Sequence, residues 1–484
     1  MHMRVSINAK KWCCVLATLI RVLALPVSAL AFPDILKDPL GLQPDRLKTG
    51  AMLPDGSLIP CQSSVDPSQP LELGSAIDVA LCNNPQIRSA WAAIKVQSGV
   101  LGEARAAYLP SVKASVSRLA NWSNSSSLSG PNDSFQKGNQ LYGTLTWRLL
   151  DFGGRSANNK VASQLLVAAL AAHEASLQKT MTEVIQAYFD AMTAQSSFIS
   201  RKKVVELTER ILAATKRRED RGVVPLSDTL QALTALAKAR LNEARAQGDF
   251  NKSLSLLVQV MGLTPGTPVR LPQTLELYRV DDVKDLNSLL RQAEENHPAI
   301  RFARAKLAAD KAKITVARSE GMPSLDATAS LSRNGYPNQG LSSINQSVTT
   351  AGVTLSLPIF EGFGRTYKIW GAQAQAEQSE AQLQETTSQA LTGVVKAHAD
   401  ALTSLGTLKA TELLMMAATF SIQSSLRRYD RNAADILEVL NSQSALADAE
   451  QERIRAVAEW RSARLRLLAE SGILGRADLL QERP

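Results

Sequence analysis

Two stretches of the chain, 149–155 and 359–365, read Leu-Leu-Asp-Phe-Gly-Gly-Arg and Ile-Phe-Glu-Gly-Phe-Gly-Arg, and they lie 210 residues apart. Upstream of each, Cys-Asn-Asn-Pro-Gln-Ile-Arg at 82–88 matches Glu-Asn-His-Pro-Ala-Ile-Arg at 295–301, with an offset of 213 residues. The matches keep their order and nearly the same spacing. The chain is therefore a tandem duplication of a unit of roughly 210 residues.

This duplication predicts the domain organisation. The offset of 210 residues also aligns three later pairs, Arg221 with Arg431, Asp228 with Glu438, and Gly262 with Gly472. We expect repeat 1 at 71–263 and repeat 2 at 283–475, joined by a linker at 264–282. A Pro-rich N-terminal arm at 32–70 precedes the repeats, and a short C-terminal tail at 476–484 follows them.

Residues 1–31 have the pattern of a secretory signal peptide. Basic residues precede an apolar stretch, and Ala29-Leu30-Ala31 fits the small-x-small rule for cleavage before Phe32. An uncleaved membrane anchor is the alternative. Cleavage lowers the formal net charge from +9 to +5, because this segment holds four basic and no acidic residues. Since the remaining charges of both signs are scattered along the chain, we expect no nucleic-acid partner.

Two cysteines, Cys61 and Cys82, remain after cleavage. Export places them in an oxidising compartment, where disulfides form and persist. We predict a disulfide that joins the Pro-rich arm to the first helix. Two buried or reduced thiols are the alternative interpretation.

Each repeat begins with a predicted helix. Ser75 and Asp78 resemble a capping box, Pro85 can sit in a first turn, and the pattern then predicts helix to about Tyr108, ending before Pro110. Repeat 2 has the same pattern from about 283 to 321.

Two predicted strands follow in each repeat. Apolar and small polar residues alternate at 111–119, 141–148, 325–332 and 350–357, a period typical of strands. The segments 121–140 and 333–346, rich in Ser, Asn and Gly, are expected to be exposed loops.

Each repeat ends with two predicted helices that turn back on each other. The stretches 154–218 and 364–429 contain no proline and have helical periodicity, which at 1.5 Å per residue predicts helices about 100 Å long. Return helices are expected at 226–262 and 434–472. Alanine and other apolar positions on both members of each pair favour an antiparallel coiled coil.

The four strands favour a membrane barrel. A lipid-spanning strand needs about 9–11 alternating residues, and closure of a barrel needs about eight strands or more. Four strands therefore require copies from other chains, and a trimer supplies 12. Aromatic residues flank the strands, as at membrane interfaces: Tyr108, Trp122, Tyr142, Trp147, Tyr336, Phe360 and Phe363. A soluble four-stranded sheet covered by helices is the alternative.

The duplicated order helix, strand, strand, long helix, helix resembles the TolC-type outer membrane efflux proteins over residues 71–475. The carrying stretches are Ala-Leu-Cys-Asn-Asn-Pro-Gln-Ile-Arg at 80–88, Ala-Tyr-Leu-Pro-Ser at 107–111, Trp-Arg-Leu-Leu-Asp-Phe-Gly-Gly-Arg at 147–155 and Leu-Ser-Leu-Pro-Ile-Phe-Glu-Gly-Phe-Gly-Arg at 355–365. The Leu-Cys-Asn-Asn-Pro start is similar to the CyaE-like subgroup, the outer membrane components of type I secretion systems for toxins.

This resemblance implies a fold that is mostly α with membrane β: a tandem-repeat outer membrane factor whose trimeric 12-stranded β-barrel is continued by a long α-helical periplasmic tunnel. It implies a homotrimer in outer membrane lipid. Expected partners are a periplasmic adaptor protein, an inner membrane ABC or RND transporter, and the exported protein or small molecule.

The resemblance also implies a gate at the periplasmic tips of the long helices. Asp228 and Tyr429 fall on gate positions, and Glu438 falls where the family has an acidic ring. Ala434 and Asn441 depart from the family pattern, which predicts a different network at the closed tip. The alternative is that these acids solvate the tip or form ion pairs with Arg427, Arg428 or Arg431.

No stretch of the chain carries a catalytic pattern. Gly-Gly-Arg-Ser at 153–156 lacks the spacing and the lysine of a phosphate loop, and His173-Glu174 lacks the second histidine of a metalloprotease. We therefore expect no enzyme activity, no metal and no cofactor. The leading hypothesis is a passive conduit for type I protein secretion; the alternatives are multidrug efflux and a periplasmic coiled-coil scaffold.

Overall fold

The computed structural model describes Leu40 and residues 65–127, 130–273, 283, 285–334, 346–431 and 433–474. For 121, 123–127, 130–134, 136, 334 and 346 it describes the backbone alone. The chain divides into residues 1–47 and 48–484, and the fold below is that of the second unit. The predicted signal peptide, Cys61, Tyr336 and the C-terminal tail lie outside the described residues.

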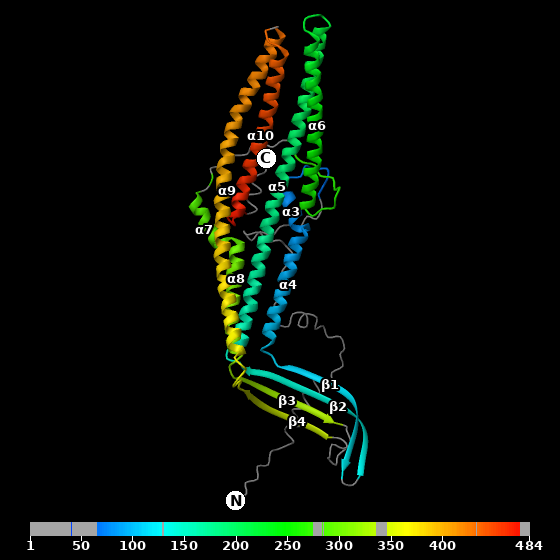
Figure 1. The fold of residues 1–484 in the computed structure, drawn as a ribbon, viewed down its shortest axis with the longest axis vertical. Coiled ribbons are helices and arrows are strands. Elements are labelled where there is room, and N and C mark those ends of the chain that lie inside the picture. Colours follow the sequence, from blue (N-terminus) through cyan, green and yellow to red (C-terminus); the bar gives the residue numbers. More distant parts are fainter. Residues whose placement is uncertain are drawn as a thin grey trace. The chain divides into compact units, whose positions relative to one another are not determined.

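Repeat 1 contains four helices and two strands (Figure 1). They are α3 (Leu73–Asn83), α4 (Pro85–Ala106), β1 (Ser111–Ser127), β2 (Gly130–Leu150), α5 (Gly154–Glu219) and α6 (Leu226–Val260). Repeat 2 has the same order: α7 (Leu286–Asn296), α8 (Pro298–Ser319), β3 (Ser324–Asn334), β4 (Gln346–Ser356), α9 (Gly364–Asp430) and α10 (Ile436–Glu470). The predicted long and return helices agree with the observed bounds to within about two residues.

The single helix expected up to Tyr108 is instead two helices, so that prediction was wrong, although Pro85 does sit in a first turn, that of α4. Helix α3 starts earlier, with Glu72 as its N-cap, so Ser75 lies inside it and caps nothing. Extended backbone at Asn84 then separates α3 from α4. The Asn84 side chain accepts a hydrogen bond from the amide of Gln86, and Pro85 occupies the first turn, which together start a new helix.

The four strands form one antiparallel sheet in the order β1-β2-β3-β4. The segment 121–140, expected to be a loop, is mostly strand: β1 and β2 pair from Ser111↔Thr146 as far as Ser127↔Gly130. The polar composition misled the prediction, because continuous ladder hydrogen bonds outweigh the low strand propensity of Ser and Asn.

The matching stretches 149–155 and 359–365 connect the sheet to the long helices. Phe152 and Gly153 have φ of 49° and 93°, and Gly362 and Phe363 have φ of 60° and 62°, so both long helices begin after a left-handed turn. The arginine that ends each stretch donates hydrogen bonds to backbone carbonyls earlier in the chain. Arg155 donates to the carbonyls of Arg148 (2.7 Å) and Leu149 (3.1 Å).

The buried core lies where the short helices pack on the long ones. In repeat 1, Ile77 of α3, Val184 and Phe189 of α5, and Leu257 of α6 are almost fully buried together. In repeat 2, α7, α9 and α10 bury a corresponding cluster. Helices α5 and α9 pack along α6 and α10 respectively, and α5 also contacts α8 and α10, so the two repeats share one interface. Among the described residues, no helix is both long and apolar enough to cross a membrane.

Candidate functional site

The tip of the α9–α10 hairpin lies beside the last turn of α5, which belongs to the other helical hairpin. Tyr429, in the last turn of α9, is only 5% exposed. Its hydroxyl lies 3.3 Å from Oγ1 of Thr215, and its carbonyl accepts a hydrogen bond of 3.0 Å from Arg218. The Arg218 guanidinium also stacks 4.3 Å from the centre of the Tyr429 ring. Both partners belong to α5, so Tyr429 holds the two hairpins together within one chain.

Glu438, in the first turn of α10, forms an ion pair across the same turn. Its carboxylate accepts a hydrogen bond of 2.8 Å from Arg428 and lies 3.3 Å from Oγ of Ser425. Its own amide donates to the N-cap Asp435. The alternative raised from the sequence, pairing with a nearby arginine, therefore applies to Glu438 within the chain, and the role of an acidic ring remains a prediction.

Asp228 lies at the corresponding place in repeat 1, in the first turn of α6. The hydroxyl of Ser227 lies 3.4 Å from its carboxylate, and no described contact joins Asp228 to Tyr429 or Glu438. Ala434 packs against the apolar cluster beneath Tyr429, whereas Asn441 is exposed. The structure thus brings Tyr429 and Glu438 to one tip and places Asp228 on the neighbouring tip.

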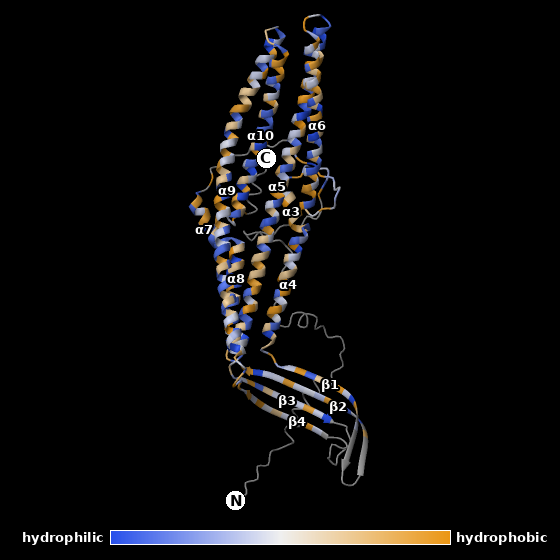
Figure 2. Ribbon diagram, viewed as in Figure 1, coloured by the Kyte–Doolittle hydropathy of each residue, from blue (hydrophilic) through white to orange (hydrophobic). Residues whose placement is uncertain are grey.

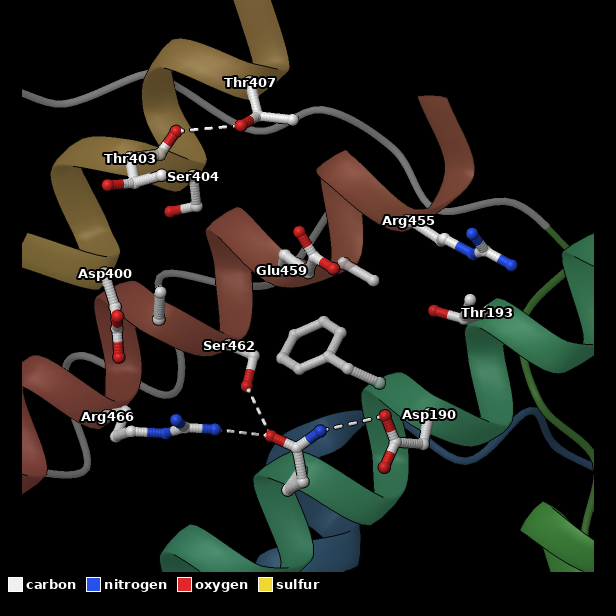
Figure 3. A pocket seen from close by; sticks show the side chains of 14 residues that line it. Asp190, Thr193, Asp400, Thr403, Ser404, Thr407, Arg455, Glu459, Ser462 and Arg466 are labelled. Carbon is white, nitrogen blue, oxygen red and sulfur yellow. Dashed lines mark hydrogen bonds between the residues drawn. The ribbon is translucent and has the colours of Figure 1, made fainter. Parts of the chain in front are cut away.

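Sequence reasoning missed a polar cavity between α5, α9 and α10 (Figure 3). The cavity measures about 500 Å³. At its centre, Gln186 accepts hydrogen bonds from Ser462 (3.2 Å) and Arg466 (2.7 Å) and donates one to Asp190 (2.9 Å). Residues from both repeats make this network, so a reading of one helix at a time gives no signal for it.

The sheet has one apolar and one polar face. Alternate residues share a face. Val112 and Val116 of β1 therefore lie with Leu145 of β2 and Val353 of β4, and all four are exposed in the single chain. Figure 2 shows apolar residues along each of the four strands. The opposite face carries Ser and Thr, with an ion pair of 2.9 Å between Arg148 and Asp326.

The predicted interface aromatics occupy different positions. Trp147 lies on the apolar face and donates to the carbonyl of Tyr108 at 3.0 Å, at the end of the sheet nearest the helices. Trp122 lies near the other end, Tyr142 on the polar face, and Phe360 in the connection before α9, where it is 74% exposed. Their role at a membrane surface stays a prediction.

Cys82 is disulfide-bonded in the structure. Its predicted partner, Cys61, lies outside the described residues, so this pairing stays a prediction. Burial lowers the pKa of both His173 and His297. Within the part of the chain that is described, no group of three His, Cys, Asp or Glu side chains could hold a metal ion.

Comparison with solved structures identifies the fold as that of outer membrane channels. The outer membrane protein VceC from Vibrio cholerae superposes with a TM-score of 0.72 at 19% identity, covering 83% of this chain and 96% of that one. The fold predicted from the sequence is confirmed.

The chain belongs to the outer membrane efflux protein family, which matches residues 76–263 and 289–472. It is 35% identical to Protein CyaE of Bordetella pertussis, over 87% of this chain and 88% of that protein. It is 23% identical to Outer membrane protein TolC of Escherichia coli (85% and 84%) and 22% identical to Alkaline protease secretion protein AprF of Pseudomonas aeruginosa (83% and 84%). The predicted resemblance is therefore confirmed.

The two matched ranges lie one in each repeat. The protein is an outer membrane channel of the efflux and secretion type, located in the outer membrane with its helical part in the periplasm.

Proposed function

We propose that three copies of this chain form a channel that serves as the outer membrane conduit of a type I protein secretion system. The similarity to CyaE and AprF favours secretion over multidrug efflux, because AprF is named for the secretion of a protease. The observation that carries the proposal is the sheet, which has two open edges and an exposed apolar face.

The open edges support the trimer. Among the described residues, β1 pairs only with β2, and β4 pairs only with β3. Such edges are a hazard unless another strand covers them. Pairing of β4 with β1 of the next copy covers both edges, and three copies supply the 12 strands of a closed barrel.

Two exposed apolar stripes on the helices support the same assembly. Helix α6 exposes Leu226, Leu230, Leu233 and Leu241, each at least half exposed. Helix α9 exposes Leu402, Leu413, Met416 and Phe420, also each at least half exposed. Because the stripes lie on different elements, contact of one with the other is heterologous, and a repeated heterologous contact closes a ring when each copy is rotated by a third of a turn.

The proposed conduit is passive. It has no catalytic step and no cofactor, and an inner membrane ABC or RND transporter supplies the energy. A periplasmic adaptor docks at the tips, where Val223 in the turn after α5 and Leu437 in the first turn of α10 are exposed. Tyr429, Glu438 and Asp228 form the gate at these tips in the closed state. Three copies of the acidic residues around the axis favour cations.

Planar-bilayer recording of the purified full chain tests this proposal. We expect a small, cation-selective conductance, and loss of most of the selectivity when Asp228 and Glu438 are both replaced by Ala. An assay of type I secretion in cells that lack their own outer membrane channel then distinguishes protein secretion from drug efflux. Export of the protein supports the proposal. Restored drug resistance without protein export supports the efflux alternative, and the absence of any conductance contradicts both.

A further inference from the structure

Strands β1 and β2 continue past the other two strands as a two-stranded ribbon (Figure 1). The pairing of β2 with β3 reaches Gln140↔Asn334, whereas the pairing of β1 with β2 continues to Ser127↔Gly130. The ribbon begins at the end of the sheet that lies away from the helix connections, since β1 starts and β2 ends beside the helices.

Three cationic side chains lie where the ribbon leaves the sheet. The register pairs Arg118 with Asn139, Ala120 with Lys137, and Leu141 with Arg333. Because alternate residues share a face, Arg118, Lys137 and Arg333 lie on the apolar face, one on each of three adjacent strands. All three are exposed.

These cations line one hollow of about 500 Å³, together with the apolar side chains of Val116 and Leu141. Charge around the hollow is unbalanced. Asp326, one of the two acidic residues in the four strands, lies on the polar face, paired with Arg148. The other, Asp133, lies farther along the ribbon, and its side chain is outside the described part. The hollow therefore offers positive charge at the border of an apolar surface.

An aromatic pair lies just beyond the cations. The rings of Trp122 and Phe135 are 4.9 Å apart, and the Lys137 ammonium lies 4.8 Å from the centre of the Phe135 ring. This group of aromatic side chains beside Lys and Arg side chains is typical of a membrane interface.

The distance between the aromatic residues also fits a membrane. On β2, Phe135 and Trp147 are 12 residues apart. This separation is about 40 Å along a strand, or roughly 30 Å along the membrane normal at a tilt of about 40°. The apolar band of outer membrane barrels is about 25 Å tall. The cations therefore lie near the outer border of the band if Trp147 marks the periplasmic border.

We propose that Arg118, Lys137 and Arg333 bind the phosphate groups of a phosphorylated lipid in the outer leaflet, while Val116 and Leu141 contact its acyl chains. Arginine forks match phosphate oxygens in two-point hydrogen bonds, and lysine adds a point charge. The inference rests on the proposed function only for the position of the strands in the membrane.

The test compares the full chain with a triple variant, Arg118→Gln with Lys137→Gln and Arg333→Gln. Lys113→Gln is the control, since Lys113 is an exposed cation on the opposite face of β1. The probe is diphosphoryl lipid A in phosphatidylcholine vesicles, with inorganic phosphate as competitor. We expect the triple variant to lose affinity by about tenfold or more, equal to about 1.4 kcal/mol. The control should keep its affinity, and millimolar phosphate should not displace the lipid.

Equal affinity of the triple variant and the parent would overturn the inference. Displacement by inorganic phosphate would also overturn it, in favour of a site for free anions. Arg333→Gln alone, with an expected loss of about threefold, replaces the triple variant if the latter does not fold. Bilayer conductance of the same samples separates the two proposals. A parent that binds the lipid without conducting contradicts the conduit, and a triple variant that conducts normally with unchanged lipid affinity contradicts the lipid site.

Discussion

Tyr429 illustrates how one side chain joins the two repeats at their tips. Its ring, hydroxyl and carbonyl all contact α5, through Thr215 and Arg218. The sequence comparison placed Tyr429 at a gate but gave no partner, because its partners lie more than 200 residues away in the chain. Asp228, predicted for the same gate, makes no described contact with Tyr429. The contacts with α5 therefore stabilise the position of Tyr429 without Asp228.

Removal of these contacts should loosen the closed tip in steps. Tyr429→Phe loses one hydroxyl hydrogen bond, which contributes about 1 kcal/mol. Arg218→Met loses a charged hydrogen bond and a cation–π contact, together about 2 kcal/mol. We expect open-channel conductance in planar bilayers to rise in both variants and more in Arg218→Met. Arg217→Met, one residue away in α5, is the control. Equal conductance in all four proteins would show that Tyr429 has no part in the closed state.

His297 is a titratable N-cap, whereas the repeat-1 equivalent, Asn84, is not titratable. Nδ1 of His297 accepts a hydrogen bond of 3.2 Å from the amide of Ala299, so this nitrogen must be unprotonated. Burial lowers its pKa from the ordinary value of 6.5. A lowered pKa in the folded state favours the neutral form. The neutral His297 cap therefore contributes its full stabilisation above pH 6.5. This stabilisation is lost as the pH falls from 6.5 through the pKa that His297 has in the folded state.

His297→Asn should remove part of this acid sensitivity. We expect the variant to match the parent in thermal unfolding at pH 7.5, and to exceed it at pH 5 by roughly 1 kcal/mol, the usual contribution of an N-cap. Circular dichroism in detergent measures both. His173, whose pKa is also lowered, is present in both proteins and cancels from the difference. Identical pH profiles would contradict the assignment.

At the scale of elements, a glycine ends the return helix of each repeat and allows close contact with the junction between the two short helices of the same repeat. Gly262 and Gly472 have φ of 72° and 71°. A Cβ at 262 would lie 2.9 Å from the carbonyl of Asn83, whereas a Cβ at 472 would lie 3.4 Å from Cα of His297. A non-glycine residue would therefore meet the same backbone strain at both positions, but its Cβ would have less room at 262 than at 472.

Gly262→Ala should therefore destabilise the protein more than Gly472→Ala. Both lose about 1 kcal/mol to the left-handed conformation, and Gly262→Ala adds a steric cost of about 1–3 kcal/mol. Thermal unfolding in detergent measures the difference, with Gly248→Ala as control, since a Cβ there meets nothing. An equal loss at both positions would show that the α3–α4 junction adapts.

The elements also show how far the sequence predicts the fold. Helix period and the lack of proline predicted α5 and α9 nearly to the residue, since long helices are determined by local pattern. The ribbon of β1 and β2 was missed, because residues such as Asn124 and Ser125 are held as strand by pairing rather than by propensity. The sequence allowed Pro85 in a first turn but did not place the break at Asn84, because that break depends on a side-chain cap to the amide of Gln86.

For the whole molecule, assembly should depend on the apolar stripes of α6 and α9. Leu230→Glu or Leu413→Glu places a charge on a stripe, at positions that are 52% and 67% exposed in the single chain. We expect the fraction of trimer in detergent to fall by about tenfold or more, as burial of an unpaired charge opposes assembly. Lys396→Glu, an exposed site on α9 away from the stripe, is the control. Light scattering after size exclusion measures the mass.

The duplication and the barrel argument were accessible from the sequence, whereas the contacts between repeats were not. The Gln186 network joins α5 to α10 through Arg466, residues about 280 positions apart. Nothing local to either helix marks these residues as partners. The cation hollow likewise depends on the register that brings Arg333 beside β2, which the alternation of apolar residues does not specify.

Electron cryo-microscopy of the full chain in lipid nanodiscs tests whether three copies close one barrel. We expect a particle with threefold symmetry, whose 12 strands close a barrel in the bilayer with α6 of one copy against α9 of the next. A single chain whose sheet lies outside the bilayer, or a ring in which β1 and β4 of neighbouring copies do not pair, would contradict it.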